Sequence, residues 1–123
     1  MTTNILWRNS IRKGFWHPHT VEIQQLTNQN VELIDEDRNI TTRIPWSQIS
    51  NVVVLNSHNV GMSDYYGFGV GHYMRSYGGV SFHNSNNIGD VAFLDKSGVV
   101  RVMFKQIMDP MGVKQLATSQ MKK

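Results

Sequence analysis

The sequence predicts a mainly β fold in which about seven antiparallel strands are followed by one C-terminal α-helix. Short runs of alternating apolar and polar residues recur along the chain, as at Val100 and Val102, and turn residues separate them. Near the C-terminus, Asp109-Pro110 indicates a helix start, because Asp caps helices well and Pro suits their first position. Consecutive short strands favour an antiparallel sandwich or a partly open barrel, with the helix covering an open end.

Size and composition indicate one globular domain that folds without disulfides or a metal. The chain has 123 residues, of which 40% are hydrophobic and 17% are charged. These values are ordinary for a single domain and too apolar for a disordered chain. The chain contains no cysteine, which excludes disulfides, thiolate zinc sites, iron–sulfur clusters and cysteine nucleophiles. A reducing cytoplasm fits this composition.

No segment of the sequence has the pattern of a membrane span or of a secretory signal. The longest apolar run is residues 52–55, whereas a span needs roughly 20 apolar residues. Near the start, Arg8, Arg12 and Lys13 are followed by a Gly-Phe-Trp-His-Pro stretch (residues 14–18) rather than by an apolar region. We therefore expect a cytoplasmic protein with no transmembrane segment.

Residues 1–18 are predicted to form an N-terminal arm, and residues 19–123 the domain itself. The arm shows no sustained apolar period, and Pro18 biases its neighbour away from helix. It is also basic, because the first acidic residue of the chain is Glu22. The net charge of the whole chain is only +3, which falls short of the dense basic patches of a dedicated nucleic-acid binder.

Two hairpins are predicted to follow the arm. Apolar residues alternate over 20–26, turn residues occupy 27–30, and a second apolar strand covers 31–34. The acidic cluster 35–37 then leads into a third strand over 40–46, whose apolar residues share one parity and so one face. Acids at a hairpin tip are more typical of a solvated turn than of a cation site.

The remaining elements include a segment of unusual composition. Pro45 ends the third strand, residues 47–49 connect it to a buried strand over 52–55, and a polar loop is expected over 56–64. Residues 65–79, here called the Tyr/Gly segment, are rich in tyrosine and glycine. They are predicted to form a further strand.

The C-terminal part is predicted to be a hairpin followed by the helix. Strands over 89–94 and 99–104 flank the turn 95–98, and their apolar residues alternate with period two. The helix is predicted over 110–121, because four apolar residues recur along one of its faces. They are Val113, Leu116, Ala117 and Met121.

The order of several motifs resembles that of the bacterial pleckstrin-homology-like domains. Residues 44–52 (Ile-Pro-Trp-Ser-Gln-Ile-Ser-Asn-Val) are similar to that family's Ile-Pro-x-x-x-Ile-x-x-Val pattern after a strand. The segment 26–31, the Gly-rich region, the turn around 96–98 and the Asp-Pro helix start also occur in the family's order. The resemblance covers about residues 20–121.

This resemblance implies a strongly bent, seven-stranded β-barrel capped by a C-terminal helix, with no catalytic residues. It also implies homo-oligomerisation in some members. Eukaryotic relatives that bind phosphoinositides carry Lys and Arg in and around the first hairpin, whereas this chain has Thr-Asn-Gln-Asn at 27–30. The chain therefore departs from the phosphoinositide-binding pattern.

The Tyr/Gly segment is the candidate partner-binding surface. Aromatic rings with hydroxyl groups, together with one cation, are favoured at binding hot spots. Its glycines leave one strand face open to close approach of another backbone. The alternative is that these rings pack across the bent sheet. The candidate residues are Tyr65, Tyr66, Phe68, His72, Tyr73, Arg75 and Tyr77.

The sequence predicts no catalytic residues, no metal and no cofactor. Five histidines, at positions 17, 19, 58, 72 and 83, are scattered and form no His-Glu-x-x-His motif. No Gly-x-Ser-x-Gly elbow is present. The glycines at 67, 69 and 71 lack the Lys-Ser/Thr pair and the following helix of a P-loop.

Three functions fit these observations. The first is a non-enzymatic interaction or scaffolding module that binds a protein partner or forms a homo-oligomer through the Tyr/Gly segment and an exposed sheet edge. The second is peripheral attachment to an anionic membrane through the arm, where aromatic and basic side chains alternate. The third is RNA binding within a larger particle, which the low charge density disfavours. The arm residues concerned are Trp7, Arg8, Arg12, Lys13, Phe15 and Trp16.

Overall fold

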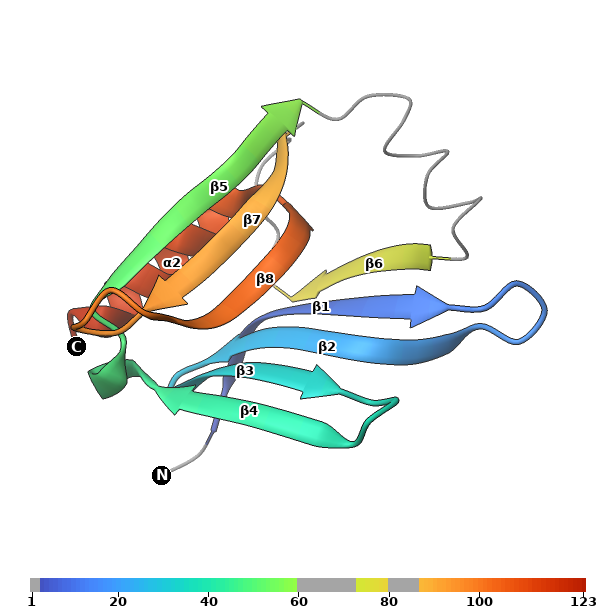
Figure 1. Ribbon diagram of the computed structural model, residues 1–123, viewed down its shortest axis with the longest axis horizontal. Coiled ribbons are helices and arrows are strands. Elements are labelled where there is room, and N and C mark those ends of the chain that lie inside the picture. The colour runs from blue at the N-terminus through green and yellow to red at the C-terminus, as the bar shows by residue number, and fades with distance from the viewer. Residues whose placement is uncertain (1–2, 60–72, 80–86) are drawn as a thin grey trace.

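The computed structural model describes residues 3–59, 73–79 and 87–123, and it confirms a mainly β fold with one C-terminal helix. Its strands form a five-stranded and a three-stranded antiparallel sheet. Through the described residues the two sheets do not close into a barrel. They pack over one another at one end of the molecule and diverge towards the other (Figure 1).

The five-stranded sheet contains the N-terminal half of the chain and one later strand. Its order is β4-β3-β2-β1-β6. The two predicted hairpins are present, with Thr27 and Asn30 at the turn between the first two of their strands. The bounds are β1 Ile5–Lys13, β2 His19–Thr27, β3 Asn30–Asp35, β4 Ile40–Pro45 and β6 Tyr73–Gly79.

The three-stranded sheet has the order β5-β7-β8, and the C-terminal helix lies alongside it (Figure 1). A short 3₁₀ turn, η1, leads into this sheet from β4. The bounds are η1 Trp46–Gln48, β5 Asn51–Asn59, β7 Asn87–Leu94, β8 Val100–Met108 and α2 Pro110–Met121.

The predicted N-terminal arm is wrong for residues 5–13, which form β1 in the interior of the five-stranded sheet. This strand pairs with β2 on one side and with β6 on the other. Trp7, Asn9 and Ile11 alternate on its buried face. The alternation of apolar residues along β1 is hard to recognise in the sequence, because polar Asn9 lies between Trp7 and Ile11. Asn9 is fully buried there and donates a hydrogen bond from Nδ2 to Gln24 Oε1 at 2.9 Å.

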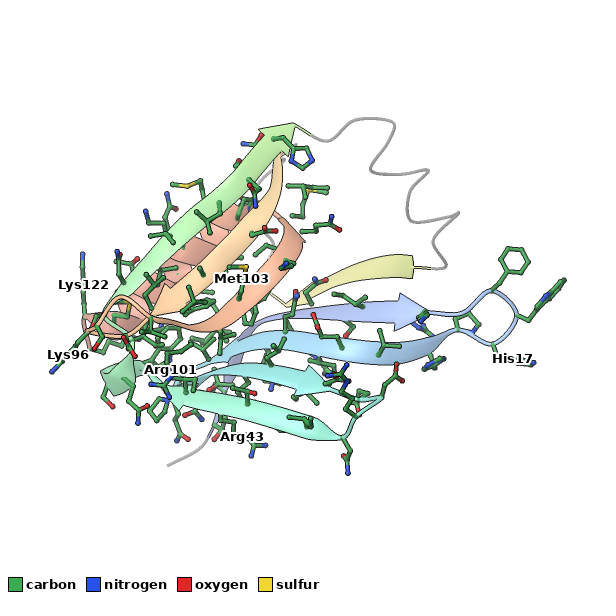
Figure 2. The ribbon with its side chains drawn as sticks, viewed as in Figure 1. His17, Arg43, Lys96, Arg101, Met103 and Lys122 are labelled. Carbon is green, nitrogen blue, oxygen red and sulfur yellow. The ribbon has the colours of Figure 1, made fainter. Side chains whose placement is uncertain are left out.

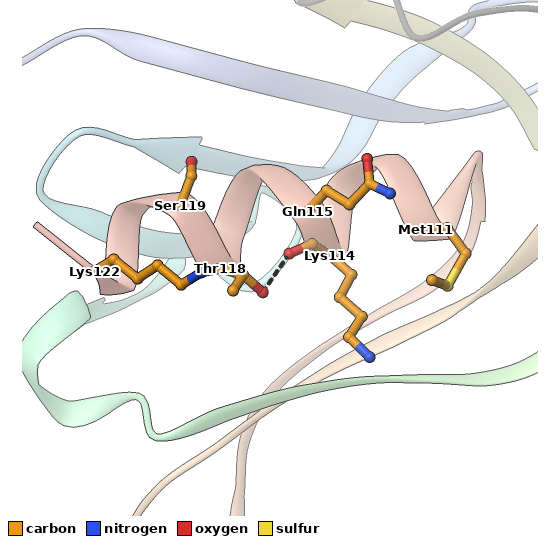
Figure 3. Close-up of a pocket in the computed structure, with 6 residues that line it drawn as sticks. All are labelled: Met111, Lys114, Gln115, Thr118, Ser119 and Lys122. Atoms are coloured by element: carbon orange, nitrogen blue, oxygen red, sulfur yellow. Dashed lines mark hydrogen bonds between the residues drawn. The ribbon is translucent and has the colours of Figure 1, made fainter.

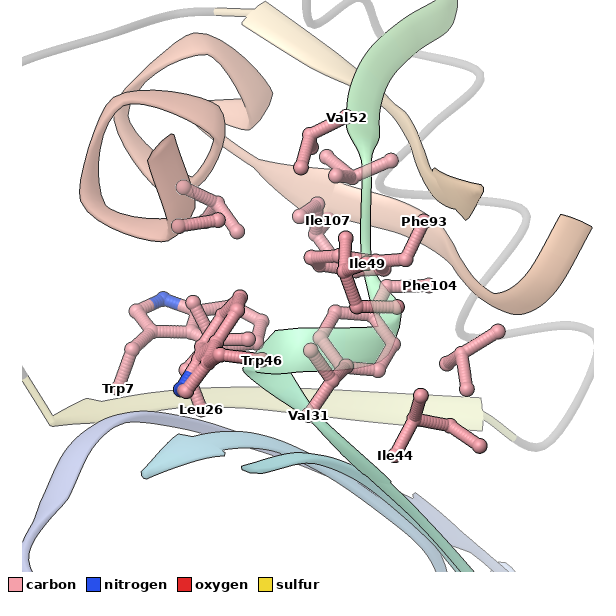
Figure 4. Packing of buried hydrophobic residues seen from close by; sticks show 14 residues of the cluster. Trp7, Leu26, Val31, Ile44, Trp46, Ile49, Val52, Phe93, Phe104 and Ile107 are labelled. Atoms are coloured by element: carbon pink, nitrogen blue, oxygen red, sulfur yellow. The ribbon is translucent and has the colours of Figure 1, made fainter. Parts of the chain in front are cut away.

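The hydrophobic core lies between the two sheets and the helix (Figure 4). Phe104 is at its centre, with its ring stacked on Trp7 at 5.6 Å and edge-on to Phe93 at 5.0 Å. Trp46 closes one side, where its Nε1 donates to the backbone oxygen of Thr27 at 2.8 Å. The core therefore joins β1, β2, η1, β7 and β8 in one packed unit.

The helix begins and packs as its sequence predicted. The Asp109 side chain accepts a hydrogen bond from Gly112 N at 3.3 Å, and Pro110 follows at the first helical position. Val113 and Ala117 are fully buried in the core. Two neighbours on that face, Leu116 and Met121, are partly buried against it.

Two bulges bend the three-stranded sheet, and one carboxylate lies between them. Asn56 and Gln106 both have left-handed backbone conformations, with φ of 54° each. Asp90, which is 8% exposed, accepts from Gln106 N at 2.8 Å and from Asn56 Nδ2 at 2.9 Å. Each bulge inserts extra residues opposite Gly89 or Asp90.

These bulges explain why β5 and β8 are longer than predicted. We expected β5 to end at residue 55 and a loop to begin at 56, but the strand resumes after its bulge and reaches Asn59. Similarly, β8 passes its bulge and reaches Met108 rather than 104. Residues 60–64 of the predicted loop lie outside the described residues.

Candidate functional site

The β1–β2 hairpin ends in a connection that projects beyond β3 and β4 of its sheet. Pairing between β2 and β3 stops at Glu22 and Asp35, whereas β1 and β2 remain paired up to Lys13 and His19. These three further residues extend the hairpin by about 10 Å. Residues 12–19, here called the hairpin tip, therefore project past the β3–β4 turn (Figure 1).

The hairpin tip has a specific backbone conformation. Gly14 has φ of +118°, where side chains are rarely tolerated, and a Cβ at this position would lie 2.7 Å from the backbone oxygen of His17. On the other side of the turn, Arg12 Nη2 donates to the backbone oxygen of Pro18 at 3.2 Å. The turn therefore requires glycine at position 14, and the hydrogen bond of Arg12 connects its two ends.

Two large aromatic side chains project from this turn into solvent. Phe15 is 69% exposed and Trp16 is 83% exposed. Their rings contact each other edge-to-face, with centroids 5.1 Å apart and planes at 87°. The chain's other two tryptophans, Trp7 and Trp46, are buried in the core. The hairpin tip thus presents an apolar surface at the end of the molecule that is farthest from the core (Figure 2).

Basic side chains surround the aromatic pair. Arg12, Lys13 and His17 are exposed, and no acidic residue precedes Glu22 in the sequence. Among the described residues, an acid of the β3–β4 turn contacts the hairpin, where Asp37 Oδ1 lies 3.5 Å from His19 Nε2. Because Asp37 contacts His19 at the base of the hairpin tip, the acidic side chains of that turn lie behind the aromatic rings rather than beside them.

Replacing Gly14 by Ala tests whether the turn conformation is required. We expect Gly14→Ala to lower the free energy of unfolding by about 2 to 3 kcal/mol, because it combines strained backbone with a contact against His17. Gly98→Ala is the matched control. Gly98 also has a positive φ, of +80°, but a Cβ there meets no atom within 4 Å, so a loss of about 1 kcal/mol is expected. Equal losses in chemical denaturation would contradict this assignment.

The structure separates the residues that the membrane hypothesis grouped in the arm. Trp7 is 4% exposed and belongs to the core, so it is unavailable to a partner. Arg8 is exposed but lies in the middle of β1, opposite Gln25. Of the six residues, Arg12, Lys13, Phe15 and Trp16 come together at the hairpin tip.

Phe15 and Trp16 were predicted together with Trp7 as the aromatic residues of the arm, and the structure leaves only these two exposed among the three. The sequence contains a signal that distinguishes the buried ring of Trp7 from the exposed rings of Phe15 and Trp16. Trp7 shares parity with Ile5 and Ile11, as a core residue of a strand does, whereas Phe15 and Trp16 are adjacent and follow a glycine.

The Tyr/Gly segment is described only in part. Tyr65, Tyr66, Phe68 and His72 lie outside the described residues. Tyr73, Arg75 and Tyr77 are in β6, where their backbones pair with Lys13, Ile11 and Asn9 of β1. The start of β6 is therefore next to the hairpin tip, and the partner-binding role of this segment stays a prediction.

Other features of the described residues are weaker candidates for a functional site. Among them, no three His, Asp or Glu side chains gather as a metal site. A shallow depression runs along the exposed side of α2 (Figure 3), where Thr118 Oγ1 donates to the Lys114 backbone oxygen at 2.8 Å. The residues that line it are Met111, Lys114, Gln115, Thr118, Ser119 and Lys122.

The chain matches no protein-family model, no curated protein and no solved structure at a significant level. The resemblance to pleckstrin-homology-like domains therefore stays a prediction. No helix in the described part of the chain is long and apolar enough to cross a membrane.

Proposed function

We propose that this protein is a non-enzymatic interaction module that contacts its partner through the hairpin tip. The observation that supports this most directly is the exposure of Phe15 and Trp16 on a projecting turn. Isolated exposed apolar residues are ordinary on protein surfaces. Two adjacent aromatic rings on a projecting turn are the kind of exposed apolar surface that marks an interaction site.

A comparison of magnitudes supports the same proposal. Burying one large apolar side chain stabilises a protein by about 1.5 to 3 kcal/mol. Phe15 and Trp16 are 69% and 83% exposed, so the monomer gains little of this burial term, to which their edge-to-face contact adds about 0.5 to 1.5 kcal/mol. Folding of the monomer therefore realises only a small part of the stabilisation that burial of these two rings could give. A partner that covers both rings would recover it.

The test is fractionation of a native cell extract that contains the full-length chain. We expect the wild-type chain to migrate with particles much larger than its own 14.1 kDa. We expect Phe15→Ser/Trp16→Ser to shift it to the position of the free chain, because the contact surface is lost. Thermal melting should show that the double variant still folds, since neither ring contributes to the core.

The matched control is Val99→Ser/Val100→Ser, which removes two exposed apolar side chains, 55% and 45% exposed, where β8 begins. This control should migrate like the wild type. Light scattering on the purified chain separates a second copy of the chain from other partners. A wild-type chain that migrates as a free monomer in the extract would overturn the proposal.

A further inference from the structure

We propose that the partner of the hairpin tip is a membrane surface that carries anionic lipids. Phe15 and Trp16 would enter the interfacial region, and Arg12 and Lys13 would contact lipid phosphates. This inference rests on the proposed function, because it names the partner of the same site. It does not follow from that function, since a protein groove could also receive the two rings.

The type and exposure of the two rings fit a lipid interface. Trp has an apolar ring system and one N–H donor, and it concentrates at the boundary between lipid headgroups and acyl chains. Trp16 is 83% exposed, and Phe15 lies beside it at 5.1 Å, so both can enter an apolar layer together. No rearrangement of the core is needed, because the rings lie beyond the last cross-strand pair, Lys13 with His19.

The positions of the basic residues fit the thickness of that interface. Arg12 and Lys13 precede Phe15 by three and two residues, so their backbones lie at most about 10 Å behind it. Interfacial segments bury their apolar side chains about 5 to 10 Å into the headgroup boundary. The Arg12 and Lys13 side chains would then be at the level of the lipid phosphates.

The local charge favours an anionic membrane over a neutral one. Arg12 is held at the hairpin tip by its hydrogen bond to the Pro18 backbone oxygen, and Lys13 is exposed beside it. The acidic residues of the β3–β4 turn are set back, and Asp35 and Asp37 there pair with Arg38 and His19. Through the described residues, the hairpin tip thus presents basic side chains beside the two rings.

Vesicle sedimentation with the full-length chain tests the apolar part of the proposal. We expect binding to vesicles of phosphatidylcholine mixed with phosphatidylserine, and much weaker binding to phosphatidylcholine alone. Phe15→Ser/Trp16→Ser should reduce partitioning into the mixed vesicles by about tenfold or more. Val99→Ser/Val100→Ser should bind like the wild type.

The electrostatic part is tested by neutralising the two cations. Arg12→Gln/Lys13→Gln should reduce binding by about fivefold or more at low salt, and less at high salt, because surface attraction is screened. The matched control is Lys96→Gln/Lys122→Gln, which removes two cations at the opposite end of the molecule (Figure 2). Arg12→Lys, which keeps the charge, should retain most of the binding.

Tryptophan fluorescence reports whether the hairpin tip itself enters the bilayer. Trp7 and Trp46 are buried, so a blue shift on addition of mixed vesicles comes from Trp16. Trp16→Phe should still sediment with vesicles but lose the blue shift.

The outcomes separate this inference from the proposed function. One outcome is that the wild-type chain does not bind mixed vesicles, while Phe15→Ser/Trp16→Ser still dissociates the chain from large particles in the cell extract. In that case the membrane partner is wrong and the interaction module stands. If the wild-type chain and Phe15→Ser/Trp16→Ser bind mixed vesicles equally, the hairpin tip is not the membrane-binding site. If the wild-type chain binds neither vesicles nor any large particle, both proposals fail.

Discussion

Phe104→Ala is expected to lower the free energy of unfolding by about 3 to 5 kcal/mol, the largest stability effect of any substitution discussed for this protein. The Phe104 side chain is fully buried and contacts the rings of both Trp7 and Phe93. Its removal leaves a cavity between the two sheets, and the surrounding large rings can close that space only in part.

Val100→Ala is the control on the same strand, because Val100 is 45% exposed and outside the core. It should change the free energy of unfolding by less than about 1 kcal/mol. Urea denaturation of both variants measures the difference. A loss below about 1.5 kcal/mol for Phe104→Ala would mean that the two sheets are not packed through this ring.

The second large effect is expected for Asp90→Ala, a loss of about 2 to 4 kcal/mol. The Asp90 carboxylate accepts hydrogen bonds from two residues with left-handed backbone, Gln106 and Asn56. Left-handed conformations are unfavourable for residues other than glycine, so they need such supporting interactions. Removing the carboxylate deprives both donors of a buried acceptor.

A double-mutant cycle with Asn56→Ala isolates one of the two hydrogen bonds. We expect Asp90→Ala and Asn56→Ala to be less than additive, because both remove the same contact. Asp95→Ala is the comparison, since the Asp95 carboxylate caps the exposed β7–β8 turn through Ser97 N and Val99 N. If Asp90→Ala cost no more than Asp95→Ala, Asp90 would not hold the bulges.

Local sequence signals predicted the helix and several hairpins correctly, because those elements depend on neighbouring residues. Asp109 and Pro110 define the start of α2, and the spacing of Val113 and Ala117 defines its buried face. The turn between β2 and β3 follows from Thr27, whose hydroxyl accepts from Gln29 N and Asn30 N. These interactions span a few residues and can be recognised without the rest of the chain.

The tertiary structure decided that Trp7 is buried and that Phe15 and Trp16 are exposed, beyond what the parity of Trp7 in the sequence indicated. Trp7 and Trp16 are similar in sequence context, since each is near basic residues, but only Trp7 lies on a strand face that meets β8. The same holds for Asp90, whose partners Asn56 and Gln106 come from separate strands. Burial depends on contacts between distant segments, so the parity of Trp7 with Ile11 indicated a strand face but not the contact of that face with Phe104. Composition therefore indicated an aromatic and basic N-terminal region, whereas packing determined that Phe15 and Trp16 are its exposed rings.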